Sequence, residues 1–172
     1  VSSGQFLVNV MRGEYDGVKV TNDLSAIVLN LGQKGSSDGD GSLPLEIMQR
    51  GEFEPKYNAP LDLLEDEYPV LPLSIYGAVA LAHPAENVNG SSDKDFFIYK
   101  FERGMGGLSG LSFDEGQFSV VGYVTQGADF IDQVETGDTI EKVVVISGAD
   151  RLKQQQQQQQ REVRRRGRGK GE

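Results

Sequence analysis

The apolar positions of this chain fall mainly into short runs, some continuous and some alternating with polar residues, which is typical of β-strands. Glycine, proline and acidic residues separate these runs. The expected strands lie within residues 26–31, 43–48, 70–83, 95–101, 117–124 and 139–147. Strands therefore dominate the expected structure.

Two segments instead place apolar residues at the spacing of a helix face. In the first, Ser3 is a suitable N-cap and Gly13 is the expected end. The second covers residues 128–138, and its expected buried side chains are Phe130, Ile131 and Val134. Short strands, glycine-rich turns and one helix near each end favour a closed antiparallel β-barrel over a parallel α/β sheet.

The formal net charge of −9 hides two unlike parts of the chain. Residues 1–150 contain 9 of the 17 basic residues and 24 of the 26 acidic ones, whereas residues 151–172 contain the other 8 basic and 2 acidic residues. Because an acidic body is a poor surface for nucleic acid, we expect no nucleic-acid partner for it. The glutamine- and arginine-rich tail, residues 153–172, has almost nothing to bury and is expected to be disordered.

The residue types that carry most enzyme chemistry are scarce. The chain has no cysteine, which excludes disulfides, cysteine-zinc sites and thiol catalysis. Its single histidine, His83, lies at the end of an expected strand and belongs to no recognisable catalytic triad. The glycine-rich segment 104–112 lacks the Lys-Ser/Thr pair of a phosphate-binding loop. No cofactor or metal is therefore expected.

The adjacent phenylalanines of the segment 95–101 are the most informative apolar pair. Successive side chains of a strand point to opposite faces, so Phe96 and Phe97 enter different surroundings. Either one lies in the core and the other lines an outer groove, or both pack against a curved sheet. The residues alone leave both interpretations open.

Several motifs occur in the order found in cyclophilins. They are YDG (15–17), GAVALAH (77–83), DFFIY (95–99), DEGQFSVVGYV (114–124) and GADFIDQVETGD (127–138). Two further stretches, LPLEIM (43–48) and GGLSGLSFDEGQFSVVGY (106–123), resemble the plant and algal multidomain cyclophilins of the chloroplast thylakoid lumen. The chain thus resembles a cyclophilin-type peptidyl-prolyl cis-trans isomerase over about residues 3–152.

This resemblance implies a mostly β fold, a cyclophilin-like closed antiparallel β-barrel capped by two α-helices. It implies that residues 1–152 are an N-terminally truncated isomerase domain, without the first strands and the helical bundle of that group. It also implies a location in the thylakoid lumen. The implied partners are proline-containing segments of client proteins, with subunits of photosynthetic membrane complexes among them.

The same resemblance implies which residues form the site. Rotation about the peptide bond before proline has a barrier of ~18–20 kcal/mol, and cyclophilins lower it with an arginine near the prolyl nitrogen and an apolar pocket for the ring. Counting from Tyr15 places the arginine position on Asn22. The implied substrate-binding residues are Val20, Val28, Asn30, Ala82, His83, Asp95, Phe97, Phe113 and Phe118.

Two of these positions change the charge of the expected site. Asn22 is neutral where the family has arginine, and Asp95 is an anion where the family has glutamine. Because charge-assisted hydrogen bonds are about twice as strong as neutral ones, we expect weak catalysis, or a non-catalytic module that binds proline-containing segments or serves as a scaffold. If the alignment is shifted, Lys19 is the nearby cation that could replace the arginine.

Overall fold

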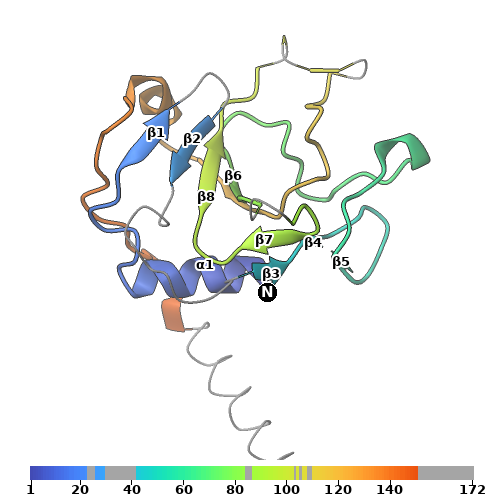
Figure 1. Ribbon diagram of the computed structural model, residues 1–172, viewed down its shortest axis with the longest axis horizontal. Helices are drawn as coiled ribbons and strands as arrows, with labels where there is room; N and C mark the ends of the chain where they lie inside the picture. Colours follow the sequence, from blue (N-terminus) through green and yellow to red (C-terminus); the bar gives the residue numbers. More distant parts are fainter. Residues whose placement is uncertain are drawn as a thin grey trace, which may run out of the picture.

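The computed structural model describes residues 1–22, 26–29, 42–83, 87–102, 104, 106–107 and 110–150. Its centre is a five-stranded antiparallel sheet in the order β1-β2-β8-β6-β9 (Figure 1). The strands are β1 (Val20–Asn22), β2 (Ala26–Leu29), β8 (Phe96–Tyr99), β6 (Ala78–Leu81) and β9 (Val120–Tyr123). The expected mostly β fold is therefore confirmed.

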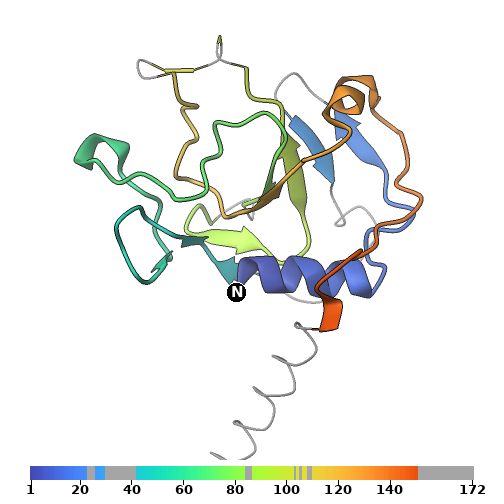
Figure 2. The same cartoon turned by 180° about the vertical axis from the view of Figure 1, so that it is seen from behind.

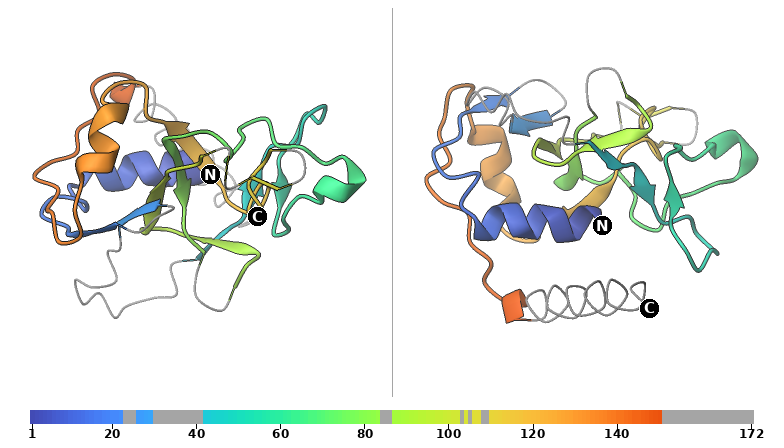
Figure 3. Two further views of the ribbon diagram at one scale, coloured as in Figure 1. Left: turned by 90° about the horizontal axis from the view of Figure 1, so that it is seen from above. Right: turned by 60° about the horizontal axis from the view of Figure 1, so that its bottom comes forward.

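Two separate two-stranded antiparallel sheets accompany the five-stranded sheet. The first pairs β3 (Ser42–Pro44) with β7 (Gly90–Ser92), and the second pairs β4 (Glu46–Ile47) with β5 (Lys56–Tyr57). A 3-10 helix, η2 (Leu63–Glu65), follows β5. The excursion 51–68 projects from the side of the molecule opposite the segment 128–138 (Figure 3).

The two phenylalanines of β8 enter different clusters. Phe96 packs with buried residues that include Tyr15 and Val20, whereas Phe97 packs with Ala80 and Tyr99 on the other face. The strand alternation that separates Phe96 from Phe97 thus gives the sheet two apolar faces. Both side chains are buried, each in its own apolar cluster, so of the two interpretations left open by the sequence the structure agrees with two packed aromatics on opposite faces of the sheet.

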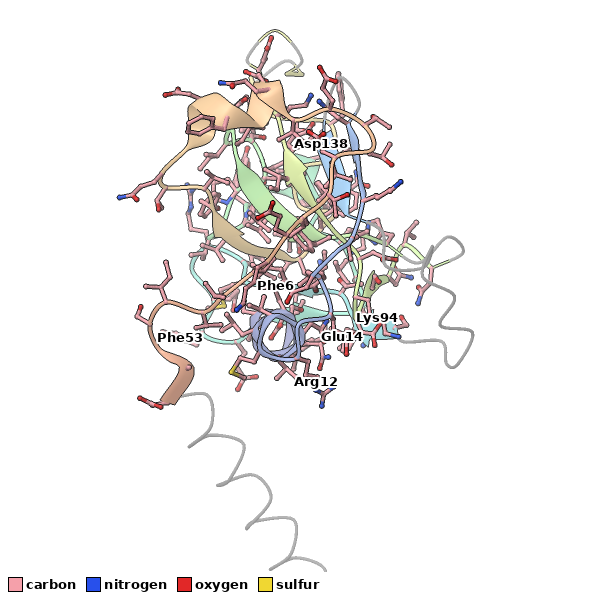
Figure 4. The ribbon with its side chains drawn as sticks, turned by 90° about the vertical axis from the view of Figure 1, so that its left-hand side faces the viewer. Phe6, Arg12, Glu14, Phe53, Lys94 and Asp138 are labelled. Carbon is pink, nitrogen blue, oxygen red and sulfur yellow. The ribbon has the colours of Figure 1, made fainter. Side chains whose placement is uncertain are left out.

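The helix α1 (Ser2–Met11) covers the Phe96 face. Phe6 of α1 points toward the sheet (Figure 4) and lies 5.1 Å from Phe96 between ring centroids, at 85°. Tyr15 lies 4.9 Å from Phe96 and is fully buried. Burial raises the pKa of Tyr15 to about 12, although a hydrogen bond from Asn9 acts to lower this pKa. Tyr15 therefore stays neutral, as its apolar surroundings require.

The start of α1 differs from the expectation that Ser3 caps it. The N-cap is Val1, and the Glu46 carboxylate of β4 accepts hydrogen bonds from the backbone nitrogens of Val1 (2.8 Å) and Ser2 (2.7 Å). Burial alone would raise the pKa of Glu46, but these hydrogen bonds lower it to about 2. A distant anion thus supplies the acceptor expected from Ser3. Gly13 follows the helix end with φ of 68°, as expected.

The second expected α-helix is a 3-10 helix, η4 (Ala128–Gln133). Gly127 at its start has a left-handed φ of 77° and no side-chain cap, and with six residues η4 is longer than most 3-10 helices. Ile131 is buried as expected, but Phe130 is 65% exposed, so the prediction that η4 buries Phe130 is wrong.

The prediction that residues 139–147 form a strand is also wrong for most of this range. Residues 137–140 exchange backbone hydrogen bonds with residues 17–20, including Ile140 N to Val18 O at 2.9 Å. Beyond Ile140, the Val143 amide instead donates to the Asp16 carboxylate at 3.0 Å. No strand is assigned to the described residues after this point, where the chain runs down past α1 (Figure 2).

The predicted tail, residues 153–172, lies outside the described residues. Within the described part of the chain, none of the helices has the length and apolar character needed to cross a membrane.

Candidate functional site

Three aromatic rings meet on the Phe97 face of the sheet. Phe97 and Phe118 lie edge to face, with centroids 5.0 Å apart at 81°, and Phe118 and His83 lie 4.2 Å apart at 34°. Ala82 and Val120 pack against the same cluster. We call the set Phe97, Phe118, His83 and Ala82 the aromatic groove, after the substrate-binding role that the cyclophilin resemblance implies for these residues; Phe97 is buried and the other three are half-buried. These four are the predicted site residues that the structure brings together.

The ring of His83 is held in one orientation. Its Nδ1 atom lies 2.8 Å from the backbone oxygen of Gly90 in β7. A carbonyl oxygen only accepts, so Nδ1 carries the hydrogen and Nε2 is the acceptor of the neutral ring. In this orientation the ring of His83 packs against the ring of Phe118.

The strand β1 presents Thr21, not Asn22, on the face of the aromatic groove. Thr21 pairs with Val28, which in turn pairs with Phe97. Directly opposed residues of an antiparallel sheet share a face, so Thr21 and Phe97 lie on the same face and Asn22 lies on the other. By the same alternation, Lys19 shares the face of Thr21.

Asn22 is tied to its own side of the sheet by several hydrogen bonds. Its side-chain nitrogen donates to the backbone oxygen of Val134, and its backbone nitrogen donates to Thr136 Oγ1 at 2.9 Å. Lys100 Nζ donates to Asn22 Oδ1 at 2.7 Å. The sequence analysis missed Lys100, although alternation from Phe96 through Ile98 places position 100 on the face of Asn22.

Of the other predicted residues, Val20 and Phe113 lie apart from the aromatic groove, whereas Asp95 is bonded to Ala82 within it. Val20 is buried in the cluster around Tyr15, on the opposite face. Phe113 is 77% exposed. Asp95 accepts the Ala82 amide through its backbone oxygen at 2.9 Å, and its charge contributes to raising the pKa of Tyr15.

The structure describes only the backbone of Val28, and Asn30 lies outside the described residues. The part played by these two residues stays a prediction.

A buried carboxylate that the sequence analysis missed fixes one wall of the groove. Glu115 is 2% exposed and accepts hydrogen bonds from the backbone nitrogens of Leu73 and Ser74, both at 2.7 Å, and from the Ser74 hydroxyl. Ser74 Oγ accepts the Ser112 amide, and Ser112 Oγ bonds the Tyr99 hydroxyl at 2.7 Å. This network joins the segment that carries Phe118 to β8.

The described residues contain no group of three or more histidine, aspartate or glutamate side chains placed to hold a metal ion. The aromatic groove itself consists of aromatic and apolar side chains, and Thr21 of β1 lies on the same face of the sheet.

In amino-acid sequence, this chain of mostly β fold is similar to peptidyl-prolyl cis-trans isomerases. It is 45% identical over 157 residues to peptidyl-prolyl cis-trans isomerase CYP37, chloroplastic, from Arabidopsis thaliana, a match that covers 88% of this chain and 32% of that protein. It is 31% identical over 163 residues to CYP38, chloroplastic, from the same plant, covering 88% of this chain and 37% of the relative.

A third relative comes from Synechocystis sp. and is provisionally named a thylakoid lumen peptidyl-prolyl cis-trans isomerase. It is 33% identical over 163 residues, which cover 88% of this chain and 42% of the relative. No family model matches the chain. The resemblance to the cyclophilin-type isomerases of the chloroplast is thereby confirmed. The chain spans less than half the length of these relatives.

Proposed function

We propose that this chain is the cyclophilin-type prolyl isomerase domain of a thylakoid lumen protein and catalyses isomerisation weakly. The observation that carries the proposal is the aromatic groove, in which Phe97, Phe118 and His83 supply apolar walls for a proline ring. The chloroplastic and thylakoid names of the relatives support the location. The proposal includes closure of the sheet into a barrel, and clients among the subunits of photosynthetic membrane complexes.

The weak catalysis follows from the charge of the strand next to the groove. Isomerisation requires the prolyl nitrogen to lose its conjugation with the carbonyl, which a hydrogen-bond donor near that nitrogen favours. Thr21 offers a neutral hydroxyl on the groove face, while Asn22 and Lys100 engage each other on the opposite face. Lys19, the cation on the same face, lies before the start of β1 and is exposed to solvent, whereas Thr21 is the residue in register with Phe97. We therefore expect the groove to bind proline but to polarise the X-Pro peptide bond only weakly.

The second candidate function is a non-catalytic module that binds proline-containing segments or serves as a scaffold. It is favoured by the same neutral strand position, because binding needs the aromatic walls and no cation. The two candidates share the groove and differ in whether a bound X-Pro bond rotates faster than in water.

Binding is tested with a short Ala-Ala-Pro-Phe peptide and the full 172-residue chain, by following the peptide's nuclear magnetic resonance signals. We expect saturable binding of the peptide to the wild type. Phe118→Ala is expected to weaken this binding by about tenfold or more, because the variant lacks the apolar surface of the ring that the proline would bury. Phe118 is half-buried, and circular dichroism of each variant monitors the fold. Phe53→Ala is the matched control, since Phe53 is 98% exposed and outside the groove. Equal affinities of the wild type and Phe118→Ala would contradict the proposed site.

A further inference from the structure

We propose that two buried serines, Ser91 and Ser119, are positioning residues of the aromatic groove. Ser91 belongs to β7, and Ser119 directly precedes β9. Their hydrogen bond sets how the ring of His83 lies against the ring of Phe118, and through these rings it sets how tightly the groove holds a proline. This inference rests on the proline-binding function proposed above.

The two serine hydroxyl groups form a pair that is closed to water. Ser91 Oγ and Ser119 Oγ lie 2.9 Å apart, and the two residues are 1% and 0% exposed. Ser119 Oγ also accepts a hydrogen bond from the backbone nitrogen of Glu46 at 2.9 Å. A buried hydroxyl that loses its partner cannot turn to water instead, so the pair resists separation.

Each serine is the chain neighbour of a residue that places one of the two rings. Ser91 follows Gly90, whose backbone oxygen accepts the hydrogen of His83 Nδ1 at 2.8 Å. Ser119 follows Phe118, whose ring centroid lies 4.2 Å from that of His83. A change in the distance between the two serines therefore moves Gly90 relative to Phe118, and His83 moves with Gly90.

Backbone hydrogen bonds complete a closed circuit around this ring contact. The Leu81 amide donates to Ser119 O at 3.1 Å, and the Ser92 amide donates to Ala82 O at 2.6 Å. The chain at the end of β6 is thus bonded on one side to the segment of Ser119 and on the other side to β7. The serine pair joins β7 directly to the segment of Ser119 and so closes the circuit.

The strand β7 is also held on its other side, by β3. Leu43 pairs with Ser91 and Pro44 pairs with Gly90, and Figure 1 shows the two strands together below the central sheet. The serine pair therefore connects the segment of Phe118 to a strand whose own place is already fixed. A groove whose walls are fixed before binding loses less conformational entropy when a ligand enters.

The placement of the rings is tested by nuclear magnetic resonance of the full 172-residue chain. His83 is the single histidine, so its ring signals are unambiguous, and their position depends on the neighbouring ring of Phe118. In Ser91→Ala and in Ser119→Ala we expect these signals to move toward those of Phe118→Ala. Ser91→Ala is the milder variant, because Ser119 Oγ keeps the hydrogen bond from the Glu46 amide.

The same variants are titrated with the Ala-Ala-Pro-Phe peptide, and circular dichroism monitors their fold. Each is expected to bind the peptide at least about threefold more weakly than the wild type, an effect of the size of one hydrogen bond. The double variant should lose little more than Ser119→Ala, because both changes remove the same bond. The matched control is Tyr15→Phe, which removes a fully buried hydroxyl on the opposite face of the sheet and should leave both readouts unchanged.

The outcomes separate this inference from the function on which it rests. Unchanged His83 signals and unchanged peptide affinity in both serine variants, with a wild type that binds the peptide, would overturn the positioning role and leave the aromatic groove in place. Equal losses in Tyr15→Phe would also overturn it, because they would show a general loss of stability. Absence of peptide binding by the wild type would instead overturn the function proposed for the groove. The His83 signals distinguish these failures, since they report the placement of the rings without any ligand.

Discussion

Introducing arginine at position 21 is expected to raise the rate of prolyl isomerisation by about 10- to 150-fold over the wild type. Thr21 shares the sheet face of Phe97 through the pairing Thr21–Val28–Phe97. An arginine there brings a charged donor to the side of the sheet that holds the proline ring. One hydrogen bond to a charged group contributes about 1.5–3 kcal/mol, which corresponds to that range of rates.

The matched variant is Asn22→Arg combined with Asp95→Gln, the pair of changes that the cyclophilin alignment suggests. We expect it to be less active than Thr21→Arg and less stable than the wild type. It removes the side-chain hydrogen bonds of Asn22 with Val134 and Lys100 and places a second cation beside Lys100. Peptide-cleavage-coupled isomerisation assays decide between the two. A gain confined to the Asn22 variant would show that the alignment, and not the register of β1, identifies the groove face.

Replacing Glu115 with alanine is expected to lower the free energy of unfolding by about 3 kcal/mol. The change leaves the buried amide of Leu73 and the part-buried amide of Ser74 without their acceptor, and an unsatisfied buried group costs about 1–3 kcal/mol. The Ser74 hydroxyl also loses its acceptor. Glu115→Gln keeps one oxygen in place and is expected to cost less.

Urea unfolding of both variants measures this effect, with Glu65→Ala as the control at an exposed position. We expect the control to lie within about 0.5 kcal/mol of the wild type. A loss in Glu115→Ala no larger than in the control would mean that the network around Ser74 and Ser112 does not hold the segment 112–118.

The strands that consist of apolar runs could be predicted from the sequence, because the need to bury their side chains is enough to indicate a strand. The segments around β2, β8 and β9 read as strands, and strand alternation separates Phe96 from Phe97. The residues after Ile140 also read as a strand, but a strand requires a partner, and the Val143 amide finds Asp16 instead. A run of apolar residues indicates that a segment can form a strand, but it does not show whether another strand is available to pair with it.

The candidate site was predictable only in part, for two physical reasons. Counting along a motif fixes positions to within about one residue, and a slip of one residue in a strand moves a side chain to the other face. Asn22 and Thr21 differ by that one step. Glu115 was missed because a charged residue usually lies at the surface, and the acceptors that Leu73 and Ser74 need become visible only once the chain is folded.

Exchange spectroscopy of an X-Pro peptide with the full chain tests most directly whether the aromatic groove binds proline without strongly accelerating its isomerisation. The same titration gives the affinity and the rate of cis-trans exchange of the bound peptide. We expect saturable binding with an exchange rate at least about tenfold below that of an ordinary cyclophilin measured in parallel, since one charged donor is absent. Exchange as fast as in the ordinary cyclophilin, or the absence of binding, would contradict this proposal.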